Sequence, residues 1–184
     1  MFAKSRWFII AATISILCIF QTAAFAQGRR HAHAQGRNAR GPVEFSLRAI
    51  DGPAVTSQSL RGEVVVLAFG ASWLPLSRQQ LEGVKKFADD YSGRGVAVYW
   101  VSTDSESSGA RNYASDDQLR ALTNKYKVSI LRDPDGALSK RFGVDQLPAF
   151  VILDKQGNLH ASIGGFDPSA DLSKQLGDRI QGIL

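Results

Sequence analysis

The spacing of hydrophobic and polar positions divides the chain into short segments with the patterns of strands and helices. Residues 43–50 have the pattern of a strand, closed by the turn DGP at 51–53, and residues 63–70, EVVVLAFG, form a nearly continuous apolar run. Such a run is typical of a strand that is buried on both faces of a sheet. From Pro75 to about Ser92, apolar residues recur three and four positions apart, which predicts an amphipathic helix.

The same alternation continues through the second half of the chain. The expected elements are a strand at 95–102, a polar loop at 104–115, a short helix marked by Leu119, Leu122 and Tyr126, a strand at 128–133, a turn at 133–136, a helix at 137–143, a hairpin at 149–154 and 158–165, and a closing helix marked by Leu172, Leu176 and Ile180. This order predicts an α/β fold with a mixed, largely parallel sheet and helices on both faces. The final hairpin adds antiparallel strands, and a domain of this length buries enough surface for a stable core without disulfides.

The N-terminal residues have the composition of a secretory signal. Lys4 and Arg6 precede an apolar stretch at 7–20, and AFA at 24–26 provides the small residues that a signal peptidase requires. We therefore expect residues 1–26 to be a signal peptide and the mature protein to be exported, to the periplasm or outside the cell. The apolar stretch is shorter than the roughly 20 residues of a membrane span, and an uncleaved N-terminal anchor is the alternative.

Residues 27–42, QGRRHAHAQGRNARGP, are basic and lack an apolar period, which predicts a flexible linker. A weak electrostatic contact with an anionic envelope surface is the functional alternative for this segment. His31 and His33 have no third ligand nearby, so we expect no zinc site there. Six of the 22 basic residues precede residue 41, and the 16 that follow nearly balance the 17 acidic ones, so we expect no nucleic-acid partner.

Four segments carry a resemblance to a known family. They are FSLRAIDGPAVTSQSLRGEVVVLAFGASW, GVAVYWVSTDS, LRDPDGALSKRFGVDQLPAFVILDKQG and NLHASIGG. Together they resemble the thioredoxin-like superfamily, in particular its exported TlpA/ResA type and the AhpC/TSA (redoxin) type. The resemblance covers nearly all of residues 43–184 and implies one thioredoxin-like domain, an α/β fold whose mixed central sheet is flanked by helices and extended by an N-terminal strand.

The chain departs from this family at the corner between the buried strand and its helix. The family has Trp-Cys-x-x-Cys where this chain has WLPLS at residues 73–77, so Leu74 replaces the nucleophilic cysteine and Ser77 the resolving one. Thiol exchange needs a thiolate, which neither residue provides, and the one cysteine of the chain is Cys18 in the predicted signal peptide. Ser77 also lacks an evident base, because His160 is the only histidine after the linker. We therefore expect no catalytic residue at this corner.

Two further features of this corner depend on the fold. In the family, a cis proline lies opposite the corner and shapes a groove for an extended substrate backbone, and Leu147 and Pro148 in GVDQLPAF occupy that place. Alternatively, Pro148 only begins an edge strand. Trp73, Leu74 and Leu76 either form an exposed apolar rim, as at many binding sites, or the leucines turn inward and fill the space of the missing cysteines.

These observations leave three hypotheses for function. The first is a non-catalytic module that binds a peptide or an envelope protein and needs no metal or cofactor. Its expected binding residues are Trp73, Leu74, Pro75, Leu76, Ser77, Leu147 and Pro148. The alternative implied by the family is a thiol-disulfide oxidoreductase or antioxidant redoxin that acts in cell redox homeostasis. The third hypothesis is electrostatic attachment through the basic linker at 27–42, in which the folded domain has no binding role of its own.

Overall fold

The computed structural model describes residues 41–184. Its elements, in chain order, are β1 (Ser46–Ala49), β2 (Val55–Thr56), β3 (Val64–Gly70), α1 (Pro75–Asp90), β4 (Val96–Ser102), α2 (Asp116–Tyr126), β5 (Ile130–Arg132), α3 (Ala137–Arg141), β6 (Ala149–Leu153), β7 (Leu159–Gly164) and α4 (Leu172–Ile180). Each strand and helix expected from the sequence is present, with ends that differ by a few residues. The two-residue strand β2, which pairs with β1 and forms the N-terminal extension of the sheet, is not predicted by the hydrophobic pattern.

The predicted signal peptide at residues 1–26 lies outside the described residues, as does the linker at 27–42 apart from its last two residues. Signal cleavage, the alternative anchor and the role of the linker histidines therefore stay predictions. Within residues 41–184, no helix combines the length and the hydrophobicity that a membrane span requires.

The strands form one mixed sheet of seven strands in the order β2-β1-β5-β4-β3-β6-β7. β3, β4 and β5 are parallel, and all the other neighbouring pairs are antiparallel. The mixed sheet is confirmed, but the prediction that it is largely parallel is wrong. Parallel neighbours need a crossover connection, and in the described chain only α1 and α2 connect neighbouring strands in this way.

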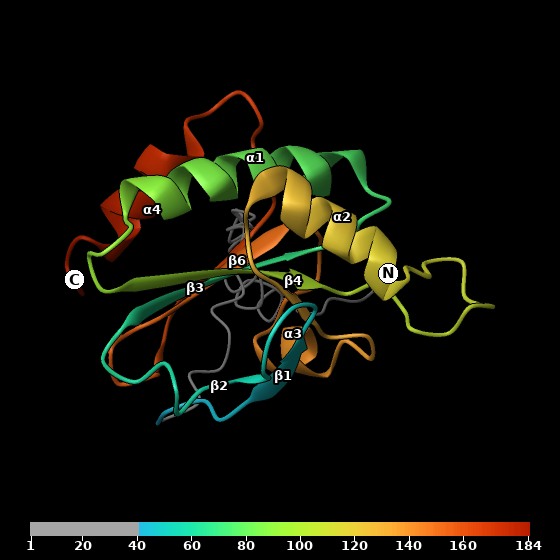
Figure 1. The fold of residues 1–184 in the computed structure, drawn as a ribbon. Helices are drawn as coiled ribbons and strands as arrows, with labels where there is room; N and C mark the ends of the chain where they lie inside the picture. The colour runs from blue at the N-terminus through green and yellow to red at the C-terminus, as the bar shows by residue number, and fades with distance from the viewer. Residues whose placement is uncertain (1–40) are drawn as a thin grey trace, which may run out of the picture. The chain divides into compact units, whose positions relative to one another are not determined.

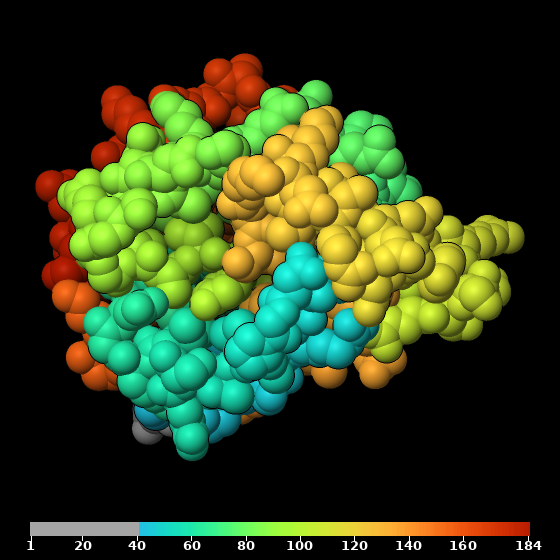
Figure 2. All heavy atoms as spheres, in the orientation of Figure 1, coloured from blue at the N-terminus to red at the C-terminus, as the bar shows by residue number. Residues whose placement is uncertain are grey.

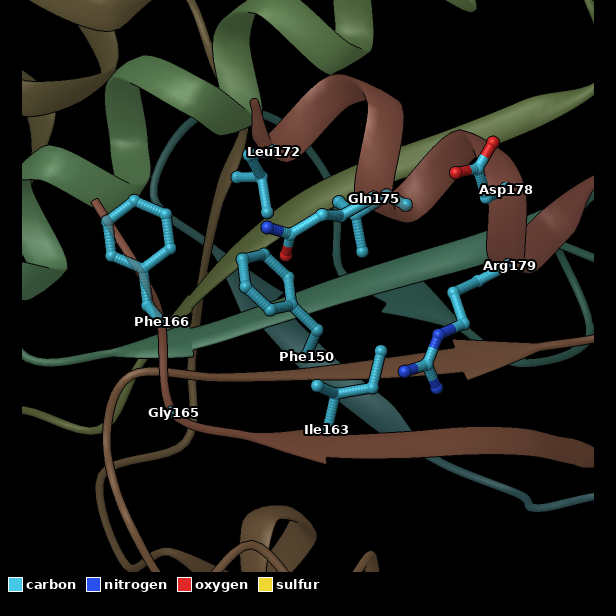
Figure 3. Close-up of a pocket in the computed structure, with 9 residues that line it drawn as sticks. Phe150, Ile163, Gly165, Phe166, Leu172, Gln175, Asp178 and Arg179 are labelled. Atoms are coloured by element: carbon cyan, nitrogen blue, oxygen red, sulfur yellow. The ribbon is translucent and has the colours of Figure 1, made fainter. Parts of the chain in front are cut away.

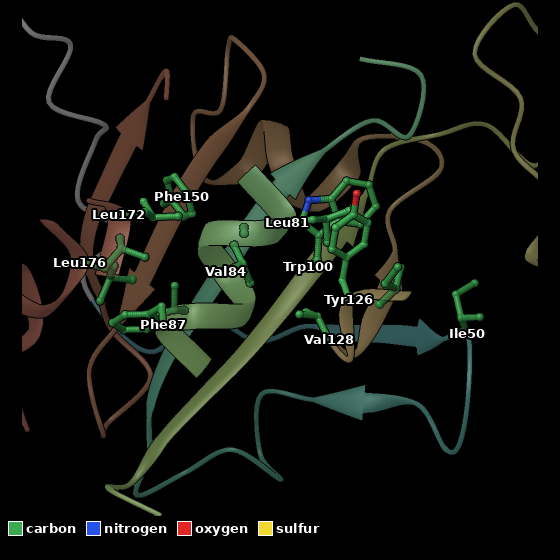
Figure 4. Packing of buried hydrophobic residues seen from close by; sticks show 14 of the residues in the cluster. Ile50, Leu81, Val84, Phe87, Trp100, Tyr126, Val128, Phe150, Leu172 and Leu176 are labelled. Atoms are coloured by element: carbon green, nitrogen blue, oxygen red, sulfur yellow. The ribbon is translucent and has the colours of Figure 1, made fainter. Parts of the chain in front are cut away.

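Helices cover both faces of the sheet, as predicted, but unequally. Figure 1 shows α1, α2 and α4 on one face and α3 on the other. On the first face, Trp100 of β4 lies in one apolar cluster with Leu81 and Phe87 of α1 (Figure 4). On the second face, Phe142 packs edge-on against Phe69, with 6.3 Å between the ring centroids. Because both faces are covered, every residue of β3 is buried, which explains its continuous apolar run.

A buried polar contact sets the position of α1 over the sheet. The side-chain Nε2 of the fully buried Gln80 donates a hydrogen bond to the Ala149 carbonyl (3.1 Å), and its Oε1 accepts one from the Trp100 indole N–H (3.1 Å). Gly70, at the end of β3, passes close to the same indole, because a Cβ there would lie 2.6 Å from Trp100 Cζ2. α1 is therefore fixed relative to β4 and β6, and so is the corner that precedes it.

Candidate functional site

The corner between β3 and α1 is formed by a backbone hydrogen bond and a proline. The N–H of Leu74 donates to the Ala71 carbonyl (3.1 Å), which turns the chain after β3. Pro75 then occupies the first turn of α1, where its missing N–H is not needed. Leu74 is the N-cap residue, and its apolar side chain makes no capping hydrogen bond. The helix thus begins with apolar side chains where a polar cap is usual.

The side chains of this corner are mostly exposed. Trp73 is 56% exposed and Leu76 is 43% exposed, which places both among the few large hydrophobic side chains on the surface of the described chain. Pro75 is also exposed, and Leu74 is half-buried. The exposed rim is confirmed for Trp73 and Leu76, and the alternative in which both leucines turn inward is wrong for Leu76.

Ser77 is a structural residue of the corner. Its side chain is fully buried, and its Oγ accepts a hydrogen bond from the Ala71 N–H (3.2 Å). His160, the only histidine after the linker, lies on β7, where its Nε2 is 3.2 Å from the Arg179 carbonyl oxygen. Because a serine nucleophile needs a base within hydrogen-bond reach, the structure supports Ser77 as a small polar residue of the first helical turn.

The backbone next to Trp73 is held by two charged residues that the sequence analysis does not single out. Asp104, just after β4, is fully buried, and its Oδ2 accepts hydrogen bonds from the Ser72 N–H (2.8 Å) and the Ser102 hydroxyl (2.8 Å). On the other side, Nε of Arg78 donates to the Ser72 carbonyl (2.7 Å). Both polar groups of the Ser72 backbone are thus bonded. The sequence signal for Asp104 is the Ser-Thr-Asp end of the strand in GVAVYWVSTDS.

The loop at 104–115 is attached to the same end of the sheet by a buried arginine. The guanidinium of Arg132, in β5, donates hydrogen bonds to the carbonyl oxygens of Asp104 (3.1 Å) and Ala114 (3.0 Å). Figure 2 shows this loop, in yellow-green, projecting from the surface beside the yellow α2. Tyr113, within the loop, is 39% exposed. The predicted polar loop is confirmed, and its backbone is anchored at both ends by one side chain.

Acidic residues around Arg132 form an ion-pair network at the base of this loop. Asp116, the first residue of α2, pairs with Arg132 (2.9 Å) and with Arg48 of β1 (2.8 Å), and Arg48 also pairs with Glu106 (2.6 Å). The hydrogen bond from Arg48 holds the pKa of Asp116 below its ordinary value, with a further lowering by Arg132 and an opposing effect of burial. The network therefore ties α2 and the loop to β1 and β5.

Pro148 lies at the same end of the sheet as the corner. β3 and β6 are antiparallel with Phe69 opposite Ala149, so the residues after Phe69 and before Ala149 leave the sheet together. The peptide bond between Leu147 and Pro148 is cis, and Pro148 is buried. The alternative that Pro148 begins an edge strand is wrong, because β6 has a neighbour on each side. The half-buried Leu147 uses neither its N–H nor its C=O in the hydrogen bonds found within the described chain.

The polar side chains bonded to the backbone of this corner are Ser77, Arg78 and the buried Asp104, beside the apolar side chains described above. The sequence contains one cysteine and one methionine, Cys18 and Met1, so the described residues contain no sulfur atom. Within residues 41–184, no group of three His, Asp or Glu side chains is arranged to hold a metal ion. The structure thus brings Trp73 and Leu76 to the same end of the sheet as Leu147 and Pro148, as the sequence analysis expects.

The chain is similar to known thioredoxin-like proteins. The model of the AhpC/TSA family matches residues 40–162. The thioredoxin-like protein YneN of Bacillus subtilis (strain 168) is 28% identical over 116 residues, which are 62% of this chain and 64% of YneN. The thiol:disulfide interchange protein DsbE of Pseudomonas aeruginosa is 27% identical over 142 residues, which are 76% of this chain and 73% of DsbE. The chain therefore spans just under two thirds of the length of YneN.

Among solved structures, the chain resembles the pneumococcal exposed lipoprotein thioredoxin Etrx1 from Streptococcus pneumoniae strain TIGR4. The TM-score is 0.61 at 25% sequence identity, and the match covers 76% of this chain and 99% of Etrx1. The predicted thioredoxin-like fold is thus confirmed. The family match ends at residue 162, inside β7, so the last part of that strand and all of α4 lie beyond it.

Proposed function

The chain belongs to the AhpC/TSA family, and from that premise we propose that it is an exported protein that binds a peptide or a partner protein without catalysing thiol exchange. The observation that carries the proposal is the exposure of Trp73 and Leu76 at the corner where the family has its cysteine pair. Clustered exposed apolar side chains mark interaction sites, whereas single ones are ordinary. Leu74 and Ser77 replace both cysteines, and neither provides the thiolate that exchange requires.

An extended peptide fits this end of the sheet as an added strand. The backbone N–H and C=O of Leu147 are unused within the described chain, and strand addition draws its affinity from such groups. Specificity then comes from neighbouring side chains, here Trp73 and Leu76. Because Asp104 and Arg78 already hold the backbone of the corner, little conformational freedom is lost when a partner binds.

Export is part of the same proposal. It rests on the predicted signal peptide at residues 1–26, and it agrees with the surface location given in the name of Etrx1, an exposed lipoprotein. The partner is therefore expected among proteins or peptides of the cell envelope.

Partner capture from the native cell envelope tests the proposal. Mature protein with an N-terminal tag should recover a partner that Trp73→Ala and Pro148→Ala variants lose. Leu184→Ala is the matched control, because Leu184 is also an exposed apolar side chain (38%) but lies at the C-terminus. Equal recovery of the partner by the wild type and by both corner variants would contradict a binding role for the corner.

The name of the relative DsbE favours a second function, thiol-disulfide exchange, and the redoxin resemblance adds an antioxidant role in redox homeostasis to this alternative. Insulin-reduction and peroxide-consumption assays on the mature protein separate the two functions. We expect no turnover in either assay, and clear turnover in one of them would establish the second function instead. A Leu74→Cys, Ser77→Cys double variant should gain insulin reduction, because it restores the pair of thiols on the same corner.

A further inference from the structure

A cavity of about 260 Å³ lies between the β6–β7 hairpin and α4 (Figure 3). Its apolar wall comes from both sides and consists of Phe150, Ile163, Phe166, Leu172 and Leu176. Protein interiors are otherwise close-packed, and a water molecule accounts for about 30 Å³ in the liquid. The hollow therefore has room for several water molecules or for one organic group with the size of a large side chain.

Two polar side chains of α4 stand beside this apolar wall. Arg179 and Gln175 both line the cavity, and Figure 3 shows the side chain of Arg179 extending from α4 toward β7, whereas the carboxylate of Asp178 points away from Arg179. The hydrogen bond that Arg179 makes to another element uses its backbone carbonyl, 3.2 Å from the Nε2 of His160. Within the described chain its guanidinium has no acidic partner. A positive charge and an amide donor thus face an apolar hollow.

The cavity belongs to the part of the chain beyond the family match. Of its apolar wall, Phe150 alone lies within residues 40–162, and the other four side chains follow that segment. None of the corner residues at 73–77 lines it. The proposal for this cavity therefore does not rest on the binding function proposed for the corner.

We propose that this cavity binds an apolar carboxylate, with one phenyl or branched alkyl group enclosed by the wall and the carboxylate paired with Arg179. The planar guanidinium donates two parallel hydrogen bonds to a carboxylate, which gives both affinity and orientation. The volume lies just below the range of about 300–1,000 Å³ that is typical of sites for drug-sized ligands, so one ring fills it. A free acid and the C-terminal residue of a peptide present this same chemistry.

Titration with hydrocinnamate, followed by calorimetry and by amide NMR spectra of the mature protein, tests the proposal. Hydrocinnamate should bind saturably and shift the signals of α4 and β7, and its neutral amide should bind about tenfold more weakly, because it lacks the charge-assisted pair. Parallel titrations with the peptide Gly-Gly-Phe and its C-terminal amide distinguish the two sources. Tighter binding of the peptide identifies a chain terminus as the ligand, and tighter binding of hydrocinnamate identifies a free acid.

Protein variants locate the site. Arg179→Ala should weaken hydrocinnamate about tenfold, whereas Arg111→Ala, at another exposed arginine, should leave its affinity unchanged. Ile163→Trp should abolish binding, because the larger side chain occupies the cavity. The comparison of acid and amide uses the wild-type protein, so it tests for recognition of the carboxylate even if a variant fails to fold. Equal binding of acid and amide, or no saturable binding of either carboxylate, would overturn the proposal.

Discussion

The corner before α1 and the cavity beside α4 lie on the same domain, but their polar and apolar groups are arranged in opposite ways. At the corner, the polar groups of the Ser72 backbone and the Ser77 hydroxyl are bonded within the chain, while Trp73 and Leu76 face solvent. At the cavity, the apolar side chains face inward and the guanidinium of Arg179 has no acidic partner within the described residues.

This difference has a physical meaning. A fixed backbone with exposed apolar side chains suits a partner that brings its own surface, because little order is lost on binding. A hollow with an unpaired charge suits a small ligand that fills it and neutralises the charge. The family resemblance identifies the first region, and the second lies beyond the family match.

The largest effect is expected where the corner is fixed to the sheet. Gln80→Ala removes both hydrogen bonds of this side chain and leaves the Trp100 indole N–H and the Ala149 carbonyl buried without a partner. Each such group costs on the order of 1–3 kcal/mol, so the free energy of unfolding should fall by about 3 kcal/mol in urea denaturation. Gln79→Ala, at the exposed neighbouring residue, should change it by less than about 0.5 kcal/mol. Similar losses in the two variants would show that this contact does not position α1.

A smaller loss is expected from the carboxylate that holds the corner backbone. Asp104→Ala removes the acceptor of the Ser72 N–H and should lower the free energy of unfolding by about 2 kcal/mol, the value of a hydrogen bond to a charged group. The Ser72 amide signal should shift, and partner capture should weaken with it. Asp145→Ala, at an exposed carboxylate, is the control. If capture persists although Ser72 has moved, the fixed backbone is not required for binding.

The ion pairs at the base of the 104–115 loop predict a pH dependence. The pKa of Asp116 lies below its ordinary value of 3.8 in the folded protein, chiefly because Arg48 donates a hydrogen bond to it. A lowered carboxyl pKa adds stability above the ordinary value, and this stability is lost as the pH falls through the folded value. Asp116→Asn should therefore lower the free energy of unfolding at neutral pH and converge with the wild type in acid.

The size of this effect is limited by solvent. Asp116 is 41% exposed, so screening reduces the expected difference to about 0.5 kcal/mol. High salt should diminish it further. Parallel thermal unfolding of the two proteins from neutral to acidic pH measures the difference, and a constant gap over the whole range would contradict the role of the charge.

The effect expected at the cavity is similarly small and has the opposite sign. Ile163→Phe adds volume toward an existing hollow, so it should raise the free energy of unfolding by about 0.5 kcal/mol. Val66→Phe, at a position that is fully buried in β3, should instead lower the free energy of unfolding by about 1–3 kcal/mol. Thermal unfolding of both variants measures the contrast. Equal destabilisation would show that the cavity closes in solution.

The sequence predicts those features that repeat along the chain. The apolar run of β3, the helical spacing after Pro75 and the position of the corner follow from residue patterns, and the place of Pro148 follows from the family resemblance. The sequence does not predict β2, which has only two residues and no period. It also overstates the parallel pairing, because alternation of strands and helices does not reveal which strands become neighbours.

Buried polar residues and cavities are harder to predict, for a physical reason. Gln80, Asp104 and Arg132 look like surface residues in a hydrophobic pattern, and inside the protein each of them is bonded to partners far away in sequence. The cavity beside α4 depends on how side chains of β6, β7 and α4 fill space, which no period in the sequence records. The structure was likewise needed to decide whether the Leu76 side chain is exposed, since the sequence left both orientations open.

Photo-crosslinking from the corner shows whether this surface contacts a partner in the cell. A photoreactive amino acid at position 76 of the mature protein, expressed in its native cells, should form a defined adduct with an envelope protein or peptide. The same residue at position 184, on another exposed apolar site, should not form it, and Trp73→Ala should reduce the adduct from position 76. Equal adducts from both positions, or none from position 76, would contradict the view that this corner is a binding surface.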